Sequence, residues 1–434
     1  MGSGSLLSSF LGALQASLAV LLTISYGVIA AQFKLLDGQS ATSISKVCVR
    51  MFLPALLITR VGAELHLDTA VRYVPVLIWA ISYTLISMAI GLLGVRIFKL
   101  PQWVTPAICF NNTTSLPLLL IQALDATGIL SSLVIGGEST AEAIKRATSY
   151  FLVCAIVGNS MTFALGPRLM DAENAPGDPN SGRKEEDAEE DSQERDQNGR
   201  QEQETGDPDE QTSLLPRTVR DAHRQAYNHS YDRGKRHWDR LHPKAQYGLG
   251  FLVDFFNAPL IGALLGAFIG LVPPLHKVFF NSQKDGGYLN AWLTTSIRNI
   301  GDLFASLQVI VVGVTLSSSL RKLKRGEHSG NVSVISTLFI VFVRFILWPI
   351  ISISFIWLLV TKTNVLSDDP MLWFTMMLMP TGPPAMKLTA MAEVNGADDE
   401  EKMAISKILV ITYAVTPLIC FTVVGALKAS QAAI

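Results

Sequence analysis

The sequence predicts an all-α polytopic membrane protein with ten transmembrane helices, arranged as a 5+5 inverted repeat with interrupted fourth and ninth helices. Composition is the first observation, because 49% of the 434 residues are hydrophobic and only 16% are charged. The second is that apolar residues form blocks of about 18 to 30 residues, long enough to cross a hydrocarbon core of about 30 Å. The third is a polar segment between two sets of five blocks, since an odd number per set implies opposite orientations in the membrane.

The ten blocks are the predicted membrane helices. Residues 1–9 lack a basic start and the first block is long enough to span, so we expect a membrane helix there and no cleavable signal peptide. Each half opens with a long apolar span. In order, the blocks cover residues 10–33, 43–61, 70–97, 103–123, 147–170, 249–273, 292–320, 332–360, 370–394 and 403–428.

The polar segment divides the chain into three regions. Residues 1–170 form the first five-helix repeat, and residues 249–434 form the second. Residues 171–248 include EEDAEEDSQERDQNG, which is acidic and contains no large apolar side chain. Such a segment cannot bury enough apolar surface to fold alone, so we expect a disordered linker.

The fourth and ninth blocks contain matching interruptions. They read NNTTSLPLLL (111–120) and MPTGPPAMKL (379–388). Proline removes a backbone N–H and stops a continuous helix, so a break is predicted in each block. Within a bilayer, non-helical backbone is tolerated only where protein buries it or where it lines a wet cavity. One proline alone favours a simple kink, but matched breaks in both halves favour a shared functional site.

Paired helix breaks near the middle of a membrane are suited to binding an anion. Each break exposes the N-terminus of a half-helix, which carries partial positive charge and free N–H groups. The side-chain amides of Asn111 and Asn112 would add further donors. A carboxylate or another small anion is therefore the predicted ligand.

Several polar residues inside the blocks need a reason, because such residues are costly in a membrane. Asn159 is expected either to line the binding pocket or to bond a neighbouring helix. Arg344 either pairs with an acid or balances the charge of a moving domain, or else it extends toward the membrane surface or caps carbonyl groups. Lys387 lies beside the second break or reaches the membrane surface. Arg298 and Asp302 are four residues apart, so they are expected to form a local ion pair.

Segments along the chain resemble the auxin efflux carrier family, which includes the plant PIN-formed and PIN-likes proteins. The first break, NNTTSLPLLL, resembles the asparagine-rich break of that family. The second break, TGPPA, departs from the family pattern because it lacks an asparagine. The similarity is closest to the PIN-likes and fungal members, and it continues outside the linker in NAPLIGALLGAFIGLVPPL, LQVIVVGVTLSSSL, VRFILWPI, TGPPAMKL and ITYAVTPLI.

The resemblance implies a scaffold domain of spans 1, 2, 6 and 7 and a transport domain of spans 3–5 and 8–10. It also implies that the fourth and ninth helices cross at Pro117 and at Pro383 or Pro384. Elevator-type alternating access and a homodimer formed through the scaffold domain are further expectations. Because plant members move indole-3-acetate anions, the resemblance implies auxin-like indole carboxylates as substrates.

Basic residues in short loops predict the orientation in the membrane. The loop RKLKRGEH (321–328) is rich in lysine and arginine and lies on the same side as the linker. Under the positive-inside rule this side is cytosolic, so both termini are expected to be lumenal. The membrane is expected to be that of the endoplasmic reticulum, with the vacuolar or Golgi membrane as the alternative. EQTSLL (210–215) has the form of an acidic-dileucine sorting signal.

We therefore interpret the chain as an elevator-type secondary transporter of small organic anions across an intracellular membrane. The alternative is a transporter-fold sensor or receptor that binds a small carboxylate without transporting it. No enzyme is expected, because an intramembrane aspartyl protease needs two mid-span aspartates and NIGDLF offers one. The net charge of −1 argues against a nucleic-acid partner. The four cysteines show no metal-type spacing, so neither a metal nor a cofactor is expected.

The candidate site consists of the two breaks and the polar or charged residues beside them. Arg344 and Lys387 are expected to couple transport to the charge of the moving domain. The residues expected to bind the substrate are Asn111, Asn112, Thr113, Ser115, Pro117, Asn159, Thr381, Gly382, Pro383 and Pro384.

Overall fold

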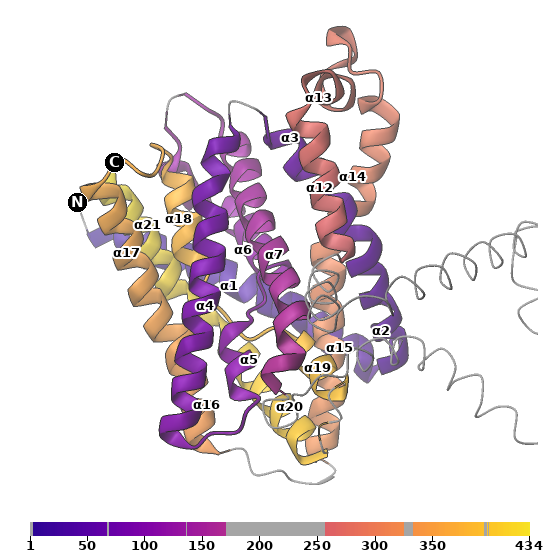
Figure 1. Cartoon of the computed structure of the whole chain (residues 1–434), viewed down its shortest axis with the longest axis vertical. Coiled ribbons are helices and arrows are strands. Elements are labelled where there is room, and N and C mark those ends of the chain that lie inside the picture. Colours follow the sequence, from indigo (N-terminus) through magenta and orange to yellow (C-terminus); the bar gives the residue numbers. More distant parts are fainter. Residues whose placement is uncertain are drawn as a thin grey trace, which may run out of the picture. The chain divides into compact units, whose positions relative to one another are not determined.

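Long helices form over the apolar blocks in the computed structural model. It describes residues 3–66, 69–135, 137–170, 257–324, 333–394, 397 and 399–434. The predicted linker, with its sorting-signal candidate, and residues 249–256 lie outside this part of the chain. Within the described residues every regular element is a helix, and the β-type pairing is one isolated bridge. The helices before residue 171 and those after residue 256 pack into one unit (Figure 1).

The helices of the first half follow the first five predicted blocks, and the fourth block is divided into two helices. The long helices are α1 (Ser3–Gln32), α4 (Tyr73–Phe98) and α7 (Thr140–Met170). The second block is a continuous run of α2 (Gly38–Val47), the π-helix η1 (Cys48–Phe52) and α3 (Leu53–Glu64). The divided block forms α5 (Val104–Cys109) and α6 (Ser115–Ala126), and the short helices are η2 (Ala70–Arg72) and η3 (Ile129–Leu133).

The second half repeats this order, and its fourth block is also divided. The sixth block contains α12 (Ala258–Leu271), followed by α13 (Pro273–Phe280) and η4 (Gln283–Asp285). The seventh contains η5 (Asn290–Thr294), α14 (Thr295–Asp302) and α15 (Phe304–Lys324), and the eighth contains α16 (Val334–Phe342), η6 (Val343–Leu347) and α17 (Trp348–Lys362). The ninth forms α18 (Pro370–Leu378) and α19 (Lys387–Val394), and the tenth forms α20 (Asp399–Ala414), η7 (Thr416–Leu418) and α21 (Ile419–Ala433).

The helices that are suited to crossing a membrane are fewer than the ten blocks. By length and composition, the described residues contain six such segments, or eight if each of two bent helix pairs counts as one span. The fourth and ninth blocks are missing from this set because their longest piece, α6, has 12 residues. About 20 residues are needed to cross a bilayer. The all-helical membrane protein is confirmed, whereas the ten-span arrangement stays a prediction.

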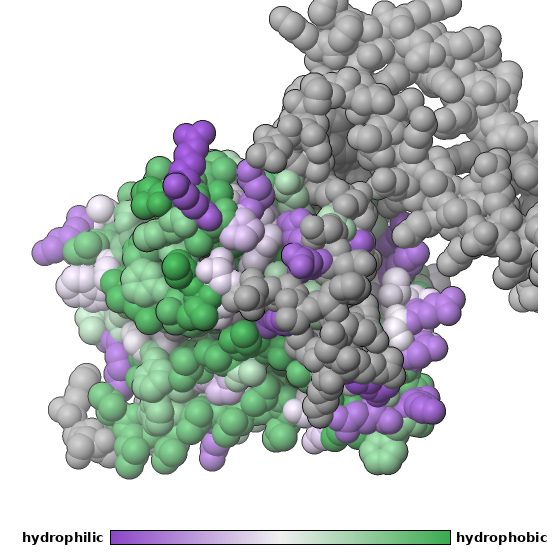
Figure 2. Space-filling view, turned by 90° about the horizontal axis from the view of Figure 1, so that it is seen from below, coloured by the Kyte–Doolittle hydropathy of each residue, from purple (hydrophilic) through white to green (hydrophobic). Residues whose placement is uncertain are grey.

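Apolar side chains cover much of the outer surface of the helical unit. Figure 2 shows hydrophobic residues over most of the visible face, with hydrophilic residues in small groups. Leu22 on α1, Ile78 on α4, Phe268 on α12 and Ile350 on α17 are examples of large exposed apolar side chains. An exposed apolar surface of this extent is expected where helices face lipid.

Glycines allow two pairs of helices to approach closely. Helix α1 crosses α15 at Gly27 and Gly313, and a Cβ atom added to Gly313 would lie 2.8 Å from the Cα atom of Gly27. Helix α12 packs on α3 in a similar way, because a Cβ on Gly266 would lie 2.9 Å from the carbonyl oxygen of Leu57. Small residues at such crossings are typical of membrane helix packing, where close contact replaces the hydrophobic effect as the driving force.

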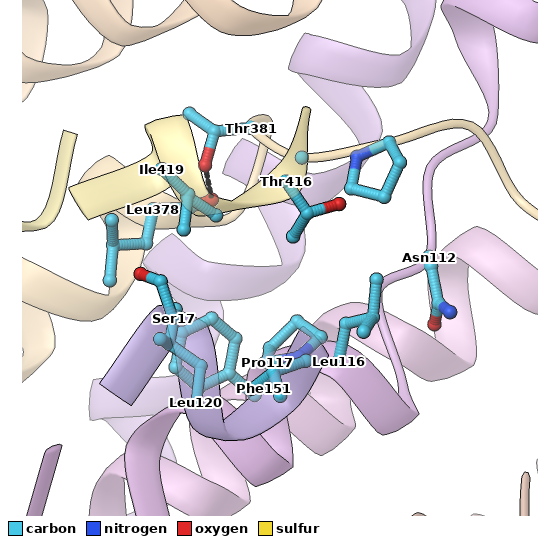
Figure 3. A pocket seen from close by; sticks show the side chains of 13 residues that line it. Ser17, Asn112, Leu116, Pro117, Leu120, Phe151, Leu378, Thr381, Thr416 and Ile419 are labelled. Carbon is cyan, nitrogen blue, oxygen red and sulfur yellow. Dashed lines mark hydrogen bonds between the residues drawn. The ribbon is translucent and has the colours of Figure 1, made fainter. Parts of the chain in front are cut away.

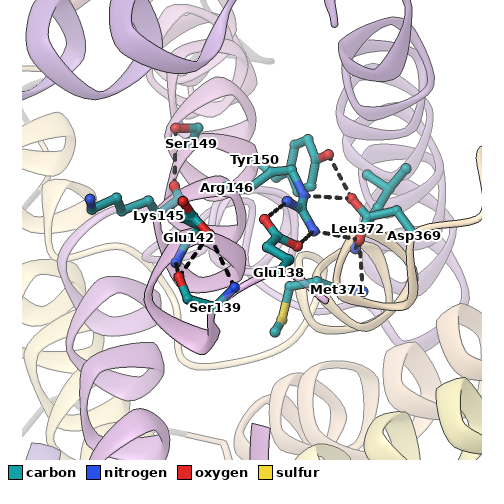
Figure 4. Close-up of polar contacts among 10 residues, drawn as sticks. All are labelled: Glu138, Ser139, Glu142, Lys145, Arg146, Ser149, Tyr150, Asp369, Met371 and Leu372. Carbon is teal, nitrogen blue, oxygen red and sulfur yellow. Dashed lines mark hydrogen bonds and ion pairs between the residues drawn. The ribbon is translucent and has the colours of Figure 1, made fainter. Parts of the chain in front are cut away.

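A charged network fixes the first turn of α18 (Figure 4). Asp369 caps this helix, and its carboxylate accepts hydrogen bonds from the backbone N–H groups of Met371 and Leu372. The same carboxylate accepts a bond of 2.9 Å from Arg146 Nε and one of 2.9 Å from the Tyr150 hydroxyl. Arg146 also forms an ion pair with Glu138, in the loop that follows η3. Arg146 therefore ties the connection after α6 to the start of α18.

The predicted ion pair between Arg298 and Asp302 is wrong. Asp302 instead accepts a hydrogen bond of 2.8 Å from Arg60 Nη2, on α3. Helix α14 packs against α3, so the carboxylate faces a cation on the neighbouring helix.

Candidate functional site

The two helix breaks lie side by side, as predicted. The first is the non-helical segment 110–114 between α5 and α6, and the second is segment 379–386 between α18 and α19. The backbone N–H of Asn112 donates to the Pro383 oxygen at 3.2 Å, and that of Ala385 donates to the Phe110 oxygen at 2.9 Å. These bonds form the isolated antiparallel bridge between Asn111 and Pro384. Each break thus supplies backbone partners that the other would otherwise lack.

Pro117 lies in the first turn of α6, two residues after the helix begins at Ser115. A helix's first turn leaves its N–H groups without intrahelical partners, so proline costs little at this place. The chain therefore opens at segment 110–114, before the proline, and the bridge forms there. Pro117 itself lines a cavity together with Pro383.

Side chains from other helices satisfy the carbonyl groups at the end of α18. Trp79 Nε1 donates to the Met376 oxygen at 2.9 Å, and Ser352 Oγ donates to the Met377 oxygen at 2.7 Å. These groups would be orphans in a helix that stops inside a membrane, where no water replaces the missing partners. The two donors therefore stabilise the end of the half-helix.

The side chain of Asn111 stabilises the turn of the second break. Its Nδ2 donates to the Met379 oxygen at 2.8 Å and to the Thr381 oxygen at 3.1 Å, so both amide N–H groups are engaged. Gly382 follows at φ +101°, a left-handed conformation that a side chain strains. Asn111 was predicted to donate to a substrate, but the structure gives these donors a structural role.

Asn112 lines two cavities beside the breaks, a polar one and an apolar one. Its Nδ2 donates to the Tyr413 hydroxyl at 3.1 Å, and its Oδ1 accepts from the hydroxyls of Thr114 and Ser115 at 3.3 Å. Tyr413 lies on α20, and the sequence analysis did not single it out. It is the tyrosine in the ITYAV segment of the tenth block, and a phenol inside an apolar block is the signal that identifies it.

The polar cavity lies between the first break and the start of α19, and one of the amide groups that line it has no hydrogen-bond partner among the described residues. Lys387, the first residue of α19, donates to Asn159 Oδ1. Since an ammonium group has no acceptor, this bond sets the orientation of the amide and leaves Nδ2 facing the other way. Asn159 Nδ2 is buried and has no hydrogen-bond partner among the described residues. An unmet buried donor of this kind indicates a place for an acceptor atom.

The N-terminus of α6 opens onto the same cavity. Its N-cap residue, Thr114, makes no side-chain capping bond, so the positive end of the helix is uncapped. Gln308 of α15 also faces this cavity, and its Oε1 has no partner in the described part of the chain. The sequence analysis missed Gln308, although an amide in the apolar run LQVIVVGV is the signal for it. The cavity is lined by Asn111, Asn112, Thr113, Thr114, Ser115, Gly158, Asn159, Thr162, Gln308, Val312, Ala385, Met386 and Lys387.

An apolar cavity lies on the other side of Asn112 (Figure 3). Most of the side chains that line it are apolar, and its polar lining residues are Ser17, Asn112, Thr381 and Thr416. Figure 3 shows the α6 side chains Leu116 and Leu120 on one wall, opposite Thr381 and Ile419. Further lining residues are Ser17, Val20, Asn112, Pro117, Phe151, Leu378, Gly382, Pro383 and Thr416.

The structure distributes the predicted site residues over several places. Pro384 belongs to the bridge between the breaks. Arg344 lines neither cavity; it donates from Nη1 to the Pro380 oxygen at 3.2 Å, so the carbonyl-capping alternative is the one observed. The polar cavity receives Asn111, Asn112, Thr113, Ser115, Asn159 and Lys387, and the apolar cavity receives Asn112, Pro117, Thr381, Gly382 and Pro383.

Comparisons with known proteins relate most of the chain to membrane transporters. A family model described as "Membrane transport protein" matches residues 13–423. The chain is 24% identical over 428 residues to the uncharacterized transporter C5D6.04 of Schizosaccharomyces pombe, which covers 93% of this chain and 91% of that protein. It is 31% identical over 150 residues to protein PIN-LIKES 5 of Arabidopsis thaliana, which covers 34% of this chain and 35% of the relative.

Proposed function

The chain belongs to the membrane transport protein family, that of the auxin efflux carriers, and from this premise we propose that it carries small organic anions as a secondary transporter. It is a transport protein of the lipid bilayer and not an enzyme. The family alone does not name the substrate. The chemistry of the two cavities supports an anion with an apolar body.

The single observation that carries this proposal is the set of donors around the polar cavity. Asn159 lines it, and its buried Nδ2 group has no partner among the described residues. The N-terminus of α6, which has no side-chain cap, adds partial positive charge, and Lys387 is a further lining residue. No aspartate or glutamate is among the described residues that line it. A carboxylate meets these groups, because it accepts several hydrogen bonds and carries a full negative charge.

The apolar cavity extends the proposal to the rest of the substrate. Asn112 borders both cavities, and we propose that the ligand extends past it, with its carboxylate among the donors and its body beside Leu116, Leu120 and Phe151. An aromatic carboxylate such as indole-3-acetate has this division into a charged group and an apolar body. The resemblance to the auxin efflux carrier family, whose plant members move indole-3-acetate anions, implies the same class.

Helix packing supports the 5+5 arrangement that such a transporter needs. Helix α1 packs along α15, which is the contact of spans 1 and 7, and α12 packs along α3, which is the contact of spans 6 and 2. An inverted repeat exchanges spans 1 and 6 and spans 2 and 7, so it makes these two contacts equivalent. We propose that these spans form the scaffold domain and a homodimer interface, and that spans 3–5 and 8–10 move as an elevator-type transport domain.

We further propose the endoplasmic reticulum membrane as the location, as expected from the resemblance to the PIN-likes proteins. We also propose that the linker is cytosolic and the termini are lumenal, because the positive-inside rule puts the basic 321–328 loop on the cytosolic side. The vacuolar or Golgi membrane is the alternative. Arg344 and Lys387 remain candidates for coupling transport to charge movement.

Uptake by purified protein in liposomes tests the proposal. Labelled indole-3-acetate and a panel of aliphatic carboxylates are compared with indole-3-acetamide, which has the same body without the charge. We expect saturable uptake of at least one carboxylate and none of the amide. Binding without uptake would favour a sensor, and the absence of both for every carboxylate would refute an anion transporter.

A further inference from the structure

Arg344 is a fully buried cation that has no counter-ion among the described residues. It lies in the π-helix η6, has no exposed surface, and donates one hydrogen bond, from Nη1 to the Pro380 oxygen. Its Nε and Nη2 atoms are buried and have no partner among the described residues. None of the ion pairs of the described residues includes it. π-helical turns are frequent at functional sites, which adds weight to this position.

A buried guanidinium normally has a carboxylate beside it, because an unpaired charge in a low-dielectric interior costs several kcal/mol. The electrostatic neighbours of Arg344 are Tyr83, Cys109 and Tyr413. A phenol and a thiol are neutral in their ordinary protonation states, so these groups do not cancel the charge. The positive field of Arg344 therefore extends into its surroundings.

Those surroundings are the two helix breaks. Pro380 belongs to the second break, and Cys109 is the residue just before the first. Tyr413 accepts the hydrogen bond from Asn112, the residue that borders both cavities. Arg344 thus lies next to both breaks where they cross. It does not line the polar cavity, but its charge acts on that cavity from a short distance.

We propose that Arg344 is a positioning residue that makes the site selective for anions, with the bound substrate as its missing counter-charge. This inference rests on the proposed function, and it goes beyond a role in moving charge because it assigns Arg344 an effect on binding. If the anion lies roughly 10 Å away at an effective dielectric constant near 20, the attraction corresponds to about a ten-fold change in affinity. A neutral ligand of the same shape gains nothing from it.

Paired substitutions separate charge from structure. Arg344→Gln removes the charge and keeps an N–H donor for the Pro380 oxygen, whereas Arg344→Lys keeps both. Arg96→Gln removes an exposed arginine at the end of α4 and serves as the matched control. Affinities for indole-3-acetate and indole-3-acetamide are measured by calorimetry on each purified protein, and the ratio of the two affinities is the readout.

We expect Arg344→Gln to lower the carboxylate-to-amide ratio about ten-fold by weakening the carboxylate alone, and Arg344→Lys to restore most of it. Equal weakening of both ligands, or an unchanged ratio in a folded Arg344→Gln protein, would overturn the inference. If Arg344→Gln does not fold, an Arg344→Lys protein with a wild-type ratio supports the inference, and one with a ten-fold lower ratio refutes it. Wild-type protein that binds no carboxylate would refute the proposed function itself, which is a different outcome.

Discussion

Exchanging Asn159 for aspartate tests the anion site with almost no change in shape. The aspartate keeps an oxygen for the Lys387 ammonium, so the contact between α7 and α19 survives. It replaces the unmet Nδ2 donor with a carboxylate oxygen on a residue that lines the polar cavity. We therefore expect the protein to fold normally and to lose its affinity for carboxylates.

The magnitude follows from two losses at this one atom. A hydrogen bond between an N–H group and a charged acceptor contributes about 1.5–3 kcal/mol. Two carboxylates about 4 Å apart repel each other by about 4 kcal/mol at an effective dielectric constant near 20. Pairing with Lys387 offsets part of the repulsion, so we expect a total loss of about 4 kcal/mol or more, which is about a thousand-fold in affinity.

Calorimetry with indole-3-acetate measures this loss, and thermal unfolding of the same preparations checks the fold. Asn364→Asp adds the same charge at an exposed position after α17 and is the matched control. A folded Asn159→Asp protein that binds the carboxylate within three-fold of wild type would refute the assignment of the polar cavity as the anion site.

Three further substitutions test other parts of the structure. Asn112→Ala removes the residue between the cavities, and we expect calorimetry to show binding weaker by roughly 1–3 kcal/mol; unchanged affinity would exclude Asn112 from the site. Gly313→Ala places a methyl group against α1, so the melting temperature should fall by the amount that an overpacking cost of about 1–3 kcal/mol produces. The control is Gly38→Ala, which should leave the melting temperature unchanged because a Cβ atom there meets no atom within 4 Å. Arg146→Met leaves the buried Asp369 without its cation and should cost about 3 kcal/mol in thermal unfolding, whereas the exposed Lys145→Met should cost little. Equal melting temperatures for the Arg146 and Lys145 variants would show that the network around Asp369 is not stabilising.

The sequence by itself determined where the membrane helices form and where two of them break. Block length decides whether a helix can cross a bilayer, and that property is local to each block. The polar residues and prolines of NNTTSLPLLL and TGPPA interrupt a helix wherever it is placed, so the positions of both breaks were predictable. Asn159 was predicted either to line a pocket or to bond a neighbouring helix; it lines the polar cavity and also bonds Lys387 of α19, and its role in binding stays a prediction.

Only the tertiary structure decided which donors remain available to a ligand. Asn111 and Asn112 are adjacent asparagines that the sequence does not distinguish. In the structure, both side-chain N–H groups of Asn111 donate to the second break, whereas the side chain of Asn112 donates to Tyr413. Asp302 forms its ion pair with Arg60 because α3 packs beside α14. In each case the outcome depends on a partner far away in the chain. A buried polar group bonds to the partner that helix packing brings within about 3 Å. A local sequence pattern does not determine which distant residue that is.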